Sequence, residues 1–197
     1  MATADFSPLS TLLKHPTGQH FTLVVGNLPA TTFQVTDFQL TEGYNRLFEL
    51  DIHAASLESA VDFGEILDNQ ATFCLWQDGV LQRKITAIVA AVEMGNTGFH
   101  RTFYRFSLRP ALWRLTLTRN SRIFQQMSVS AILDSLLQAH HISDYEFAIE
   151  ETRPVREFCV QYRESDYEFF CRLAAEEGWF FFTEQPVESA KNTLVLC

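Results

Sequence analysis

Residues 155–182 read VREFCVQYRESDYEFFCRLAAEEGWFFF, and this stretch decides the fold of the C-terminal part of the chain. Ser165 and Glu168 have the spacing of a capping box, in which each side chain accepts a backbone N–H at a helix start. Asp166 adds negative charge where the helix dipole favours it. Gly178 suits the left-handed residue that ends a helix. The stretch therefore predicts a strand, a helix that begins after Ser165, and an aromatic strand beyond Gly178.

The preceding region alternates apolar and polar residues with period two. Residues 20–110 contain five to seven such segments, separated by turn signals at short intervals. Asp78 and Gly79 are suited to a tight hairpin turn, and Pro110 ends the last strand. This spacing is typical of a small antiparallel barrel or sandwich. We expect a mainly β fold with some α-helix.

Three parts are expected along the chain. Residues 1–18 form a weakly patterned lead-in, and residues 19–125 form a first β-barrel module. Residues 126–197 form a helix-containing connector and the beginning of a second β-module, with Ser128 as a helix N-cap. Residues 193–197 resemble a strand that is cut short, so we expect the chain to be a fragment of a longer protein.

Charge and cysteine content exclude several classes of function. The net charge of −9 argues against nucleic acid and against an anionic membrane surface. No apolar run approaches the roughly 20 residues of a membrane span. The first twenty residues carry no apolar h-region after a basic start, so we expect no signal peptide. Cys159 and Cys171 are more consistent with reduced thiols than with a disulfide.

Motifs for catalysis and metal binding are absent. The chain has no GxSxG, GxxxxGK, HExxH or CxxC pattern, so no catalytic, cofactor or metal residue is expected. His140 and His141 are adjacent, and neighbouring helical side chains point about 100° apart, which favours a structural role. Glu176 and Glu177 are interpreted as a solvated helix end for the same reason.

Two clusters allow more than one interpretation. An aromatic cluster is expected to pack in the core, although stacking on a sugar or nucleobase is an alternative; it consists of Phe169, Phe170, Trp179, Phe180, Phe181 and Phe182. A basic run in this acidic chain is either a solvated loop or a contact with a subunit or tube protein; it consists of Arg109, Arg114, Arg119 and Arg122.

Taken together, these residues resemble the VgrG family of type VI secretion spike proteins. The family pattern is a Val-Gln-Tyr strand, a Glu-x-Asp helix start, Phe and Arg-Leu within the helix, and a Glu-Gly stop. The residues that match it, with an expected structural role, are Gln161, Tyr162, Glu164, Asp166, Phe169, Arg172, Leu173, Glu177 and Gly178. Upstream, residues 109–115 and 120–125 also fit, and the resemblance runs from about residue 20 to the end.

The resemblance implies a β-barrel of the phage tail hub type and a mechanical role. Two related barrel modules per chain would form a homotrimeric ring that matches the Hcp tube hexamer. The hub would carry the spike, baseplate components and effectors. It would assemble in the bacterial cytoplasm and be secreted through the type VI apparatus. The competing hypotheses are a barrel that binds a glycan or lipid in a large cavity, and a hydrolase with titratable groups clustered in a cleft.

Overall fold

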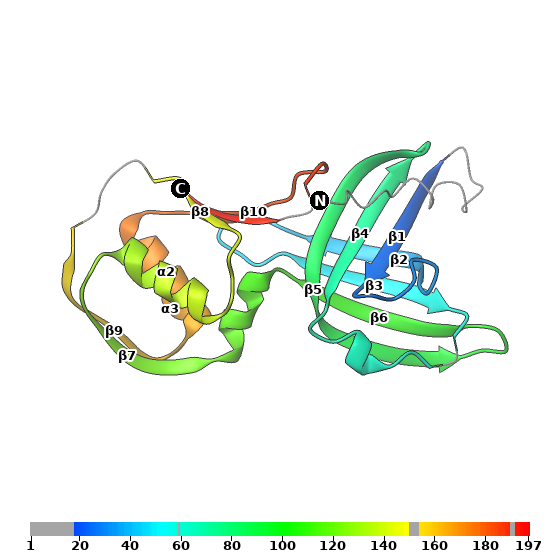
Figure 1. The fold of residues 1–197 in the computed structure, drawn as a ribbon, viewed down its shortest axis with the longest axis horizontal. Coiled ribbons are helices and arrows are strands. Elements are labelled where there is room, and N and C mark those ends of the chain that lie inside the picture. Colours follow the sequence, from blue (N-terminus) through cyan, green and yellow to red (C-terminus); the bar gives the residue numbers. More distant parts are fainter. Residues whose placement is uncertain (1–17, 59, 150–153, 190–191) are drawn as a thin grey trace. The chain divides into compact units, whose positions relative to one another are not determined.

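The chain divides into two compact units. A computed structural model describes residues 18–58, 60–149, 154–189 and 192–197 (Figure 1). The described residues within Met1–Gln39, Leu50–Leu108 and Pro186–Ala190 form unit 1, and those within Leu40–Glu49, Arg109–Gln185 and Lys191–Cys197 form unit 2. The chain thus passes from one unit to the other more than once, with the longest part of unit 2 beginning at Arg109. The predicted end of a first module at residue 125 stays a prediction.

Unit 1 contains a six-stranded, curled antiparallel sheet that forms a half-barrel. In spatial order its strands are β1 (Gln19–Val25), β4 (Gln70–Gln77), β5 (Val80–Thr97), β6 (Thr102–Arg109), β3 (Glu49–Ser56) and β2 (Gln34–Thr41). A short helical turn, η1 (Phe63–Glu65), precedes β4. Asp78 and Gly79 both have positive φ, at 51° and 79°, which confirms the primed turn predicted between β4 and β5. The mainly β fold class is confirmed.

Aromatic side chains fill the inside of the half-barrel. Tyr104, Phe106 and Phe73 are at most 2% exposed. Phe21 on β1 meets Phe38 on β2 edge to face, with ring centroids 5.0 Å apart. Ring contacts therefore connect the two edge strands. Because these rings occupy the interior, the packing speaks against the hypothesis of a barrel that holds a large ligand.

Unit 2 combines two helices with two small sheets. The helices are α2 (Val129–Ala139) and α3 (Asp166–Glu177), preceded by the 3-10 helix η2 (Ala111–Leu117). One sheet is an antiparallel ribbon of β7 (Arg119–Met127) and β9 (Arg156–Ser165). The other has the order β10 (Phe181–Glu184), β11 (Thr193–Leu196), β8 (Tyr145–Phe147), with β11 and β8 parallel. None of the helices in the described part of the chain is long and apolar enough to cross a membrane.

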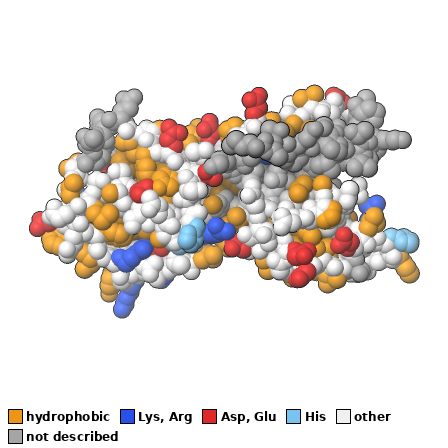
Figure 2. Space-filling view, in the orientation of Figure 1, with side chains coloured by type: hydrophobic (Ala, Val, Ile, Leu, Met, Phe, Trp, Pro, Cys, Tyr) orange, Lys and Arg blue, Asp and Glu red, His pale blue; other side chains and the backbone are white. Residues whose placement is uncertain are grey.

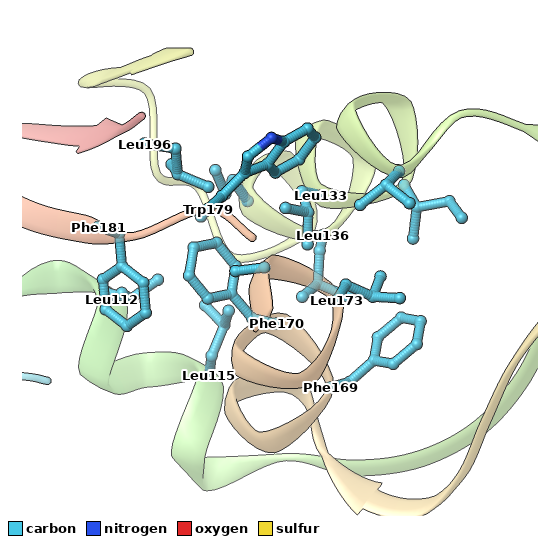
Figure 3. Close-up of a cluster of buried hydrophobic side chains, with 14 of the residues drawn as sticks. Leu112, Leu115, Leu133, Leu136, Phe169, Phe170, Leu173, Trp179, Phe181 and Leu196 are labelled. Carbon is cyan, nitrogen blue, oxygen red and sulfur yellow. The ribbon is translucent and has the colours of Figure 1, made fainter. Parts of the chain in front are cut away.

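The core of unit 2 lies between η2, α2, α3 and β10. Figure 3 shows Leu115, Leu136, Phe170 and Leu173 pointing toward one another from the three helical segments, and all four are at most 1% exposed. Phe181 meets Phe170 edge to face, at 5.1 Å between ring centroids. The helices are therefore held by one shared apolar cluster.

The local signals at the helix ends are confirmed. Ser165 and Glu168 form the reciprocal capping box, and Ser128 accepts a hydrogen bond from the Ala131 N–H as the N-cap of α2. Gly178 ends α3 with a φ of 75°. The aromatic strand begins at Phe181, two residues later than its predicted start at Trp179.

Candidate functional site

The ribbon of β7 and β9 has one face toward the helices and one toward solvent. Phe124 and Cys159 are opposite each other on the inner face, where Phe124 stacks on Phe169 of α3 at 5.6 Å. Ile123 and Val160 are opposite each other on the outer face and are 65% and 47% exposed. Both strands curve around the helices (Figure 1). The ribbon thus connects the core to an exposed surface.

A buried carboxylate lies where the ribbon meets the helices. Asp166 is the first residue of α3 and is 2% exposed. Its two oxygens accept hydrogen bonds from five side chains: Thr118 Oγ1 (3.0 Å), Asn120 Nδ2 (3.0 Å), Arg122 Nη2 (2.7 Å), His140 Nε2 (2.8 Å) and Gln161 Nε2 (2.7 Å). These donors come from the segment before β7, from β7, from the end of α2, and from β9. One carboxylate therefore fixes four segments to the start of α3.

The network keeps Asp166 ionised. Burial by itself would raise its pKa, but the hydrogen bonds from Gln161, His140, Asn120 and Thr118 outweigh burial and lower the pKa to about 2. Donors that favour the charged form have this effect on a carboxyl group. Asp166 is thus a stable anion at neutral pH and has no proton to donate.

The arrangement of Thr118, His140 and Asp166 does not match a catalytic triad. In a triad, one imidazole nitrogen meets the carboxylate and the other meets the nucleophile. Here the same atom, His140 Nε2, lies 2.8 Å from the Asp166 carboxylate and 3.3 Å from the Thr118 hydroxyl. This histidine therefore cannot pass a proton from the hydroxyl toward the carboxylate. The contacts fit a role in holding the segments together.

A second ionic network attaches α3 to β9. Arg172 donates to both oxygens of Glu164, at 2.6 and 3.2 Å, and to Glu176 at 2.9 Å. Arg156 at the start of β9 contacts Glu176 at 2.6 Å and Glu177 at 2.5 Å. Burial would raise the pKa of Glu176, but the two guanidinium groups lower it. The strand and the helix are thus connected at both ends.

A sequence profile of the phage tail baseplate hub (GPD) family matches residues 41–197. The chain belongs to this family. It is 43% identical over 175 residues to the type VI secretion system spike protein VgrG2a of Pseudomonas aeruginosa, and 44% identical over 147 residues to the actin cross-linking toxin VgrG1 of Vibrio cholerae. These alignments cover 89% and 75% of this chain but 20% and 13% of the two relatives. The predicted resemblance to VgrG is confirmed.

The hub fold is also found among solved structures. The E. coli c3393 protein, described as a type VI secretion component similar to the T4 tail proteins gp27 and gp5, matches with a TM-score of 0.80. Sequence identity is 23%, and the match covers 88% of this chain and 48% of that protein. A tail protein of the Shewanella oneidensis prophage MuSo2 matches at 0.59 and 13% identity. At these identities the likeness concerns the fold alone.

Most of the residues that match the VgrG family pattern belong to the core or to the two networks described above. Gln161 is fully buried, accepts from Arg122 and donates to Asp166. Phe169 and Leu173 are in the core, and Glu164, Arg172 and Glu177 are ion-paired. Tyr162 is different: its side chain is 66% exposed on the outer face of the ribbon. The sequence did not distinguish this position from the buried ones.

The four arginines lie in different environments. Arg109 ends β6 and is near Glu49 at 3.8 Å, and Arg114 is half-buried in η2. Arg122 is held by Gln161 and Asp166. Arg119 donates to the Arg163 carbonyl at 2.8 Å, and its side chain is 65% exposed. Arg119 and Arg122 lie in strand β7, so the solvated-loop interpretation is wrong for these two. A contact with a subunit or tube protein stays a prediction.

The remaining candidate residues take part in structural contacts. His140 joins the Asp166 network, and no group of three metal-ligating side chains occurs among the residues that the structure describes. Glu176 and Glu177 are both paired with Arg156 instead of being simply solvated. All four cysteines are free, and burial raises the pKa of Cys159.

The predicted aromatic cluster is divided between the core of unit 2 and its surface. Phe169, Phe170, Trp179 and Phe181 are in the core, as predicted. Phe180 is 42% exposed, and both it and Phe182 meet Tyr44 edge to face at 5.6 Å. Core packing is therefore the wrong interpretation for Phe180, which lies just before β10; neighbouring residues of extended chain point to opposite sides, and Phe181 takes the buried one.

Proposed function

We propose that this chain is the hub portion of a type VI secretion spike protein. In this role it trimerises within the longer protein and seats the Hcp tube on one side. It carries the spike, baseplate contacts and effectors on the other during contractile secretion. It assembles in the bacterial cytoplasm and leaves through the type VI apparatus.

The observation that carries the proposal is the hub family match over residues 41–197, together with the hub fold at a TM-score of 0.80. The chain spans about a fifth of the length of the spike protein VgrG2a, to which it is similar. Proteins that transmit force through repeated subunit contacts need rigid modules and extensive interfaces. The anchored ribbon and the filled half-barrel are suited to such a load.

The chemistry of the buried network also favours a mechanical role over catalysis. The Asp166 carboxylate is 2% exposed and is surrounded by five donors, so no substrate can reach it. Its pKa of about 2 makes it a poor proton donor at neutral pH. We therefore propose that this part of the protein makes and breaks no covalent bond.

Native mass spectrometry and Hcp pull-down test the proposal. The longest natural protein that contains this chain should be trimeric and should retain purified Hcp hexamers. Arg119→Ser tests the predicted arginine contact and should weaken Hcp retention or trimer formation. Arg101→Ser, which removes an exposed arginine of unit 1, is the control and should leave both unchanged. A monomeric long protein that does not bind Hcp would refute the proposal.

A further inference from the structure

The connection between β2 and β3 forms part of unit 2, although both strands are paired in the sheet of unit 1. Unit 2 includes Leu40–Glu49, and β2 and β3 are neighbours in the six-stranded sheet. Between these two strands, the Thr36 hydroxyl donates to the His53 carbonyl at 3.1 Å. We call residues 42–48 the strap. The chain thus leaves unit 1 at the end of β2, contributes the strap to unit 2, and re-enters unit 1 in β3.

Asn45 of the strap caps the edge of β10, which is the outer strand of its sheet. Phe180 and Cys197 exchange two backbone hydrogen bonds, of 3.0 and 2.9 Å, so in the alternating antiparallel ladder the N–H and C=O of Phe181 point to the opposite edge. There the Asn45 N–H donates to the Phe181 carbonyl at 2.9 Å, and the Phe181 N–H donates to Asn45 Oδ1 at 3.0 Å. Asn45 has a φ of 56°, a conformation that asparagine tolerates. One residue thus makes both bonds that a neighbouring strand would make.

Residues on either side of this cap attach the strap to the rest of unit 2. The Tyr44 ring meets the rings of Phe180 and Phe182 edge to face. Leu47 packs against the apolar core of unit 2, and its backbone forms a hydrogen bond with the Tyr167 hydroxyl of α3. The strap is therefore held by the strand β10, by the helix α3 and by the core.

Two of the contact residues of the strap lie on the surface. Tyr44 is 69% exposed, and Asn45 is exposed as well. Hydrophobic side chains reach the surface of unit 2 at several places (Figure 2). Substitution of Tyr44 and Asn45 should therefore remove contacts of the strap while the buried core stays intact.

Pairing of β2 with β3 lowers the entropic cost of placing the strap. While the two strands are paired, the ends of the strap are held close together, and only residues 42–48 must be ordered to make its contacts. If the pair opened, the strap would lie in a longer flexible segment, and ordering it would cost more conformational entropy. The contacts of the strap are therefore more favourable when β2 and β3 are folded. By thermodynamic linkage, the same contacts stabilise the pairing of β2 with β3.

We propose that the strap couples the stability of the two units, so that opening of β2 and β3 in unit 1 uncovers the edge of β10 and loosens unit 2. The reverse holds to the same extent, because a coupling free energy is reciprocal. An uncovered strand edge is a template for pairing with another chain. The strap thus keeps this edge closed for as long as unit 1 is folded. The coupling does not depend on the hub function proposed above.

Amide hydrogen exchange of the whole 197-residue chain, followed by NMR, first tests the cap on β10. Asn45→Gly keeps the positive φ but removes the Oδ1 acceptor, so the Phe181 amide should exchange at least about tenfold faster. Asn45→Asp keeps an oxygen acceptor at the same place and should change this rate less than about threefold. Equal rates in the wild-type chain and in Asn45→Gly would contradict the proposal, because the edge would then be closed without the strap.

A buried substitution in each unit then tests the coupling. Ile52 in β3 and Ile132 in α2 are both fully buried, and replacing either by Val should speed exchange in its own unit about three- to tenfold. In the wild-type background, Ile52→Val should speed exchange of the α3 amides by about the same factor, and Ile132→Val that of the β6 amides. In the Tyr44→Ser/Asn45→Gly background, the effect on the other unit should fall below about 1.5-fold.

The outcomes separate the strap from other sources of cooperativity. An effect on the other unit that persists in the Tyr44→Ser/Asn45→Gly background would overturn the proposal, since the units would then be coupled by other means. The absence of any such effect in the wild-type background would overturn it as well. Phe99→Ser removes a fully exposed aromatic of unit 1 and is the control, which should leave exchange in unit 2 unchanged. These measurements involve neither trimers nor Hcp, so a failure here would not bear on the hub function.

Discussion

Replacing Asp166 by Asn tests whether the buried network is what holds the ribbon to the helices. Lowering the pKa from 3.8 to about 2 corresponds to roughly 2.5 kcal/mol of folded-state stability at neutral pH. Asparagine keeps the shape but removes the charge opposite Arg122, and its NH₂ group must face a donor such as Asn120 or Gln161. We therefore expect the free energy of unfolding to fall by about 2–4 kcal/mol.

The stability that Asp166 contributes should decrease as the pH falls. The folded-state pKa of Asp166 lies below the unfolded value, so its contribution is nearly complete above about pH 5 and is lost as pH falls toward 2. At pH 3 the contribution should have fallen to about half its neutral value. The difference between the wild-type chain and Asp166→Asn should therefore shrink between pH 5 and pH 3 and be constant above pH 5.

Urea unfolding followed by circular dichroism at 222 nm is the appropriate assay. The α-helices that the structure describes, α2 and α3, both belong to unit 2, so this signal reports on the unit that contains Asp166. Glu157→Gln removes an exposed carboxylate from the same unit and should cost less than about 0.5 kcal/mol. A loss below about 1 kcal/mol for Asp166→Asn at pH 7, or a difference independent of pH, would refute the reasoning.

Three further substitutions test separate features by denaturant unfolding. Gly178→Ala should lower the free energy of unfolding by about 1 kcal/mol, because a φ of 75° is unfavourable for a residue with a Cβ. No steric clash adds to this loss, since nothing lies within 4 Å of the position that a Cβ would take. Gly178→Asn should lower it less, because Asn tolerates positive φ better. Tyr104→Phe should lower the free energy of unfolding by about 1–3 kcal/mol, because the buried Val61 N–H donates to the tyrosine hydroxyl and would lose its acceptor. Tyr162→Phe, at an exposed position, should leave it unchanged. Ser165→Ala should cost about 1 kcal/mol by removing half of the capping box, and Ser165→Asp should recover most of it. A neutral result in any of these would show that the contact does not contribute to stability.

Features encoded by neighbouring residues were predictable from the sequence. The capping box, the Gly178 stop and the Asp78–Gly79 turn each depend on backbone conformations that a few side chains determine. The long hairpin strands were predictable because a period-two pattern over many residues has few alternatives. None of these features depends on residues elsewhere in the chain.

Strand β7 was missed because its pattern is weak. Among residues 119–127 the two large aliphatic or aromatic side chains, Ile123 and Phe124, are adjacent, so no alternation is visible, and polar residues surround them. Its strand conformation comes from pairing with β9, about 40 residues later, and from Arg122, which reaches Asp166. Propensity says little where distant partners decide the conformation.

The Asp166 network was only partly predictable, for a similar reason. The Ser165–Glu168 pattern predicts a carboxylate at a helix N-terminus, and this is where Asp166 lies. Its burial has no local signal, because Thr118, Asn120 and His140 meet the carboxylate only after the chain has folded. A motif whose members are far apart in sequence carries no spacing signal. Gln161 was identified by family resemblance alone, without a physical reason.

The ribbon is anchored by apolar and polar contacts together. A two-stranded ribbon is marginally stable alone and normally buries its apolar face. Here the inner face buries Phe124 and Cys159 against the helices, and beside them Gln161 and Arg122 bind a buried anion. Charge-assisted hydrogen bonds therefore add to the hydrophobic contact that holds the ribbon. Because the inner face alone anchors both strands, the apolar side chains of the outer face can stay exposed without loss of the ribbon's attachment.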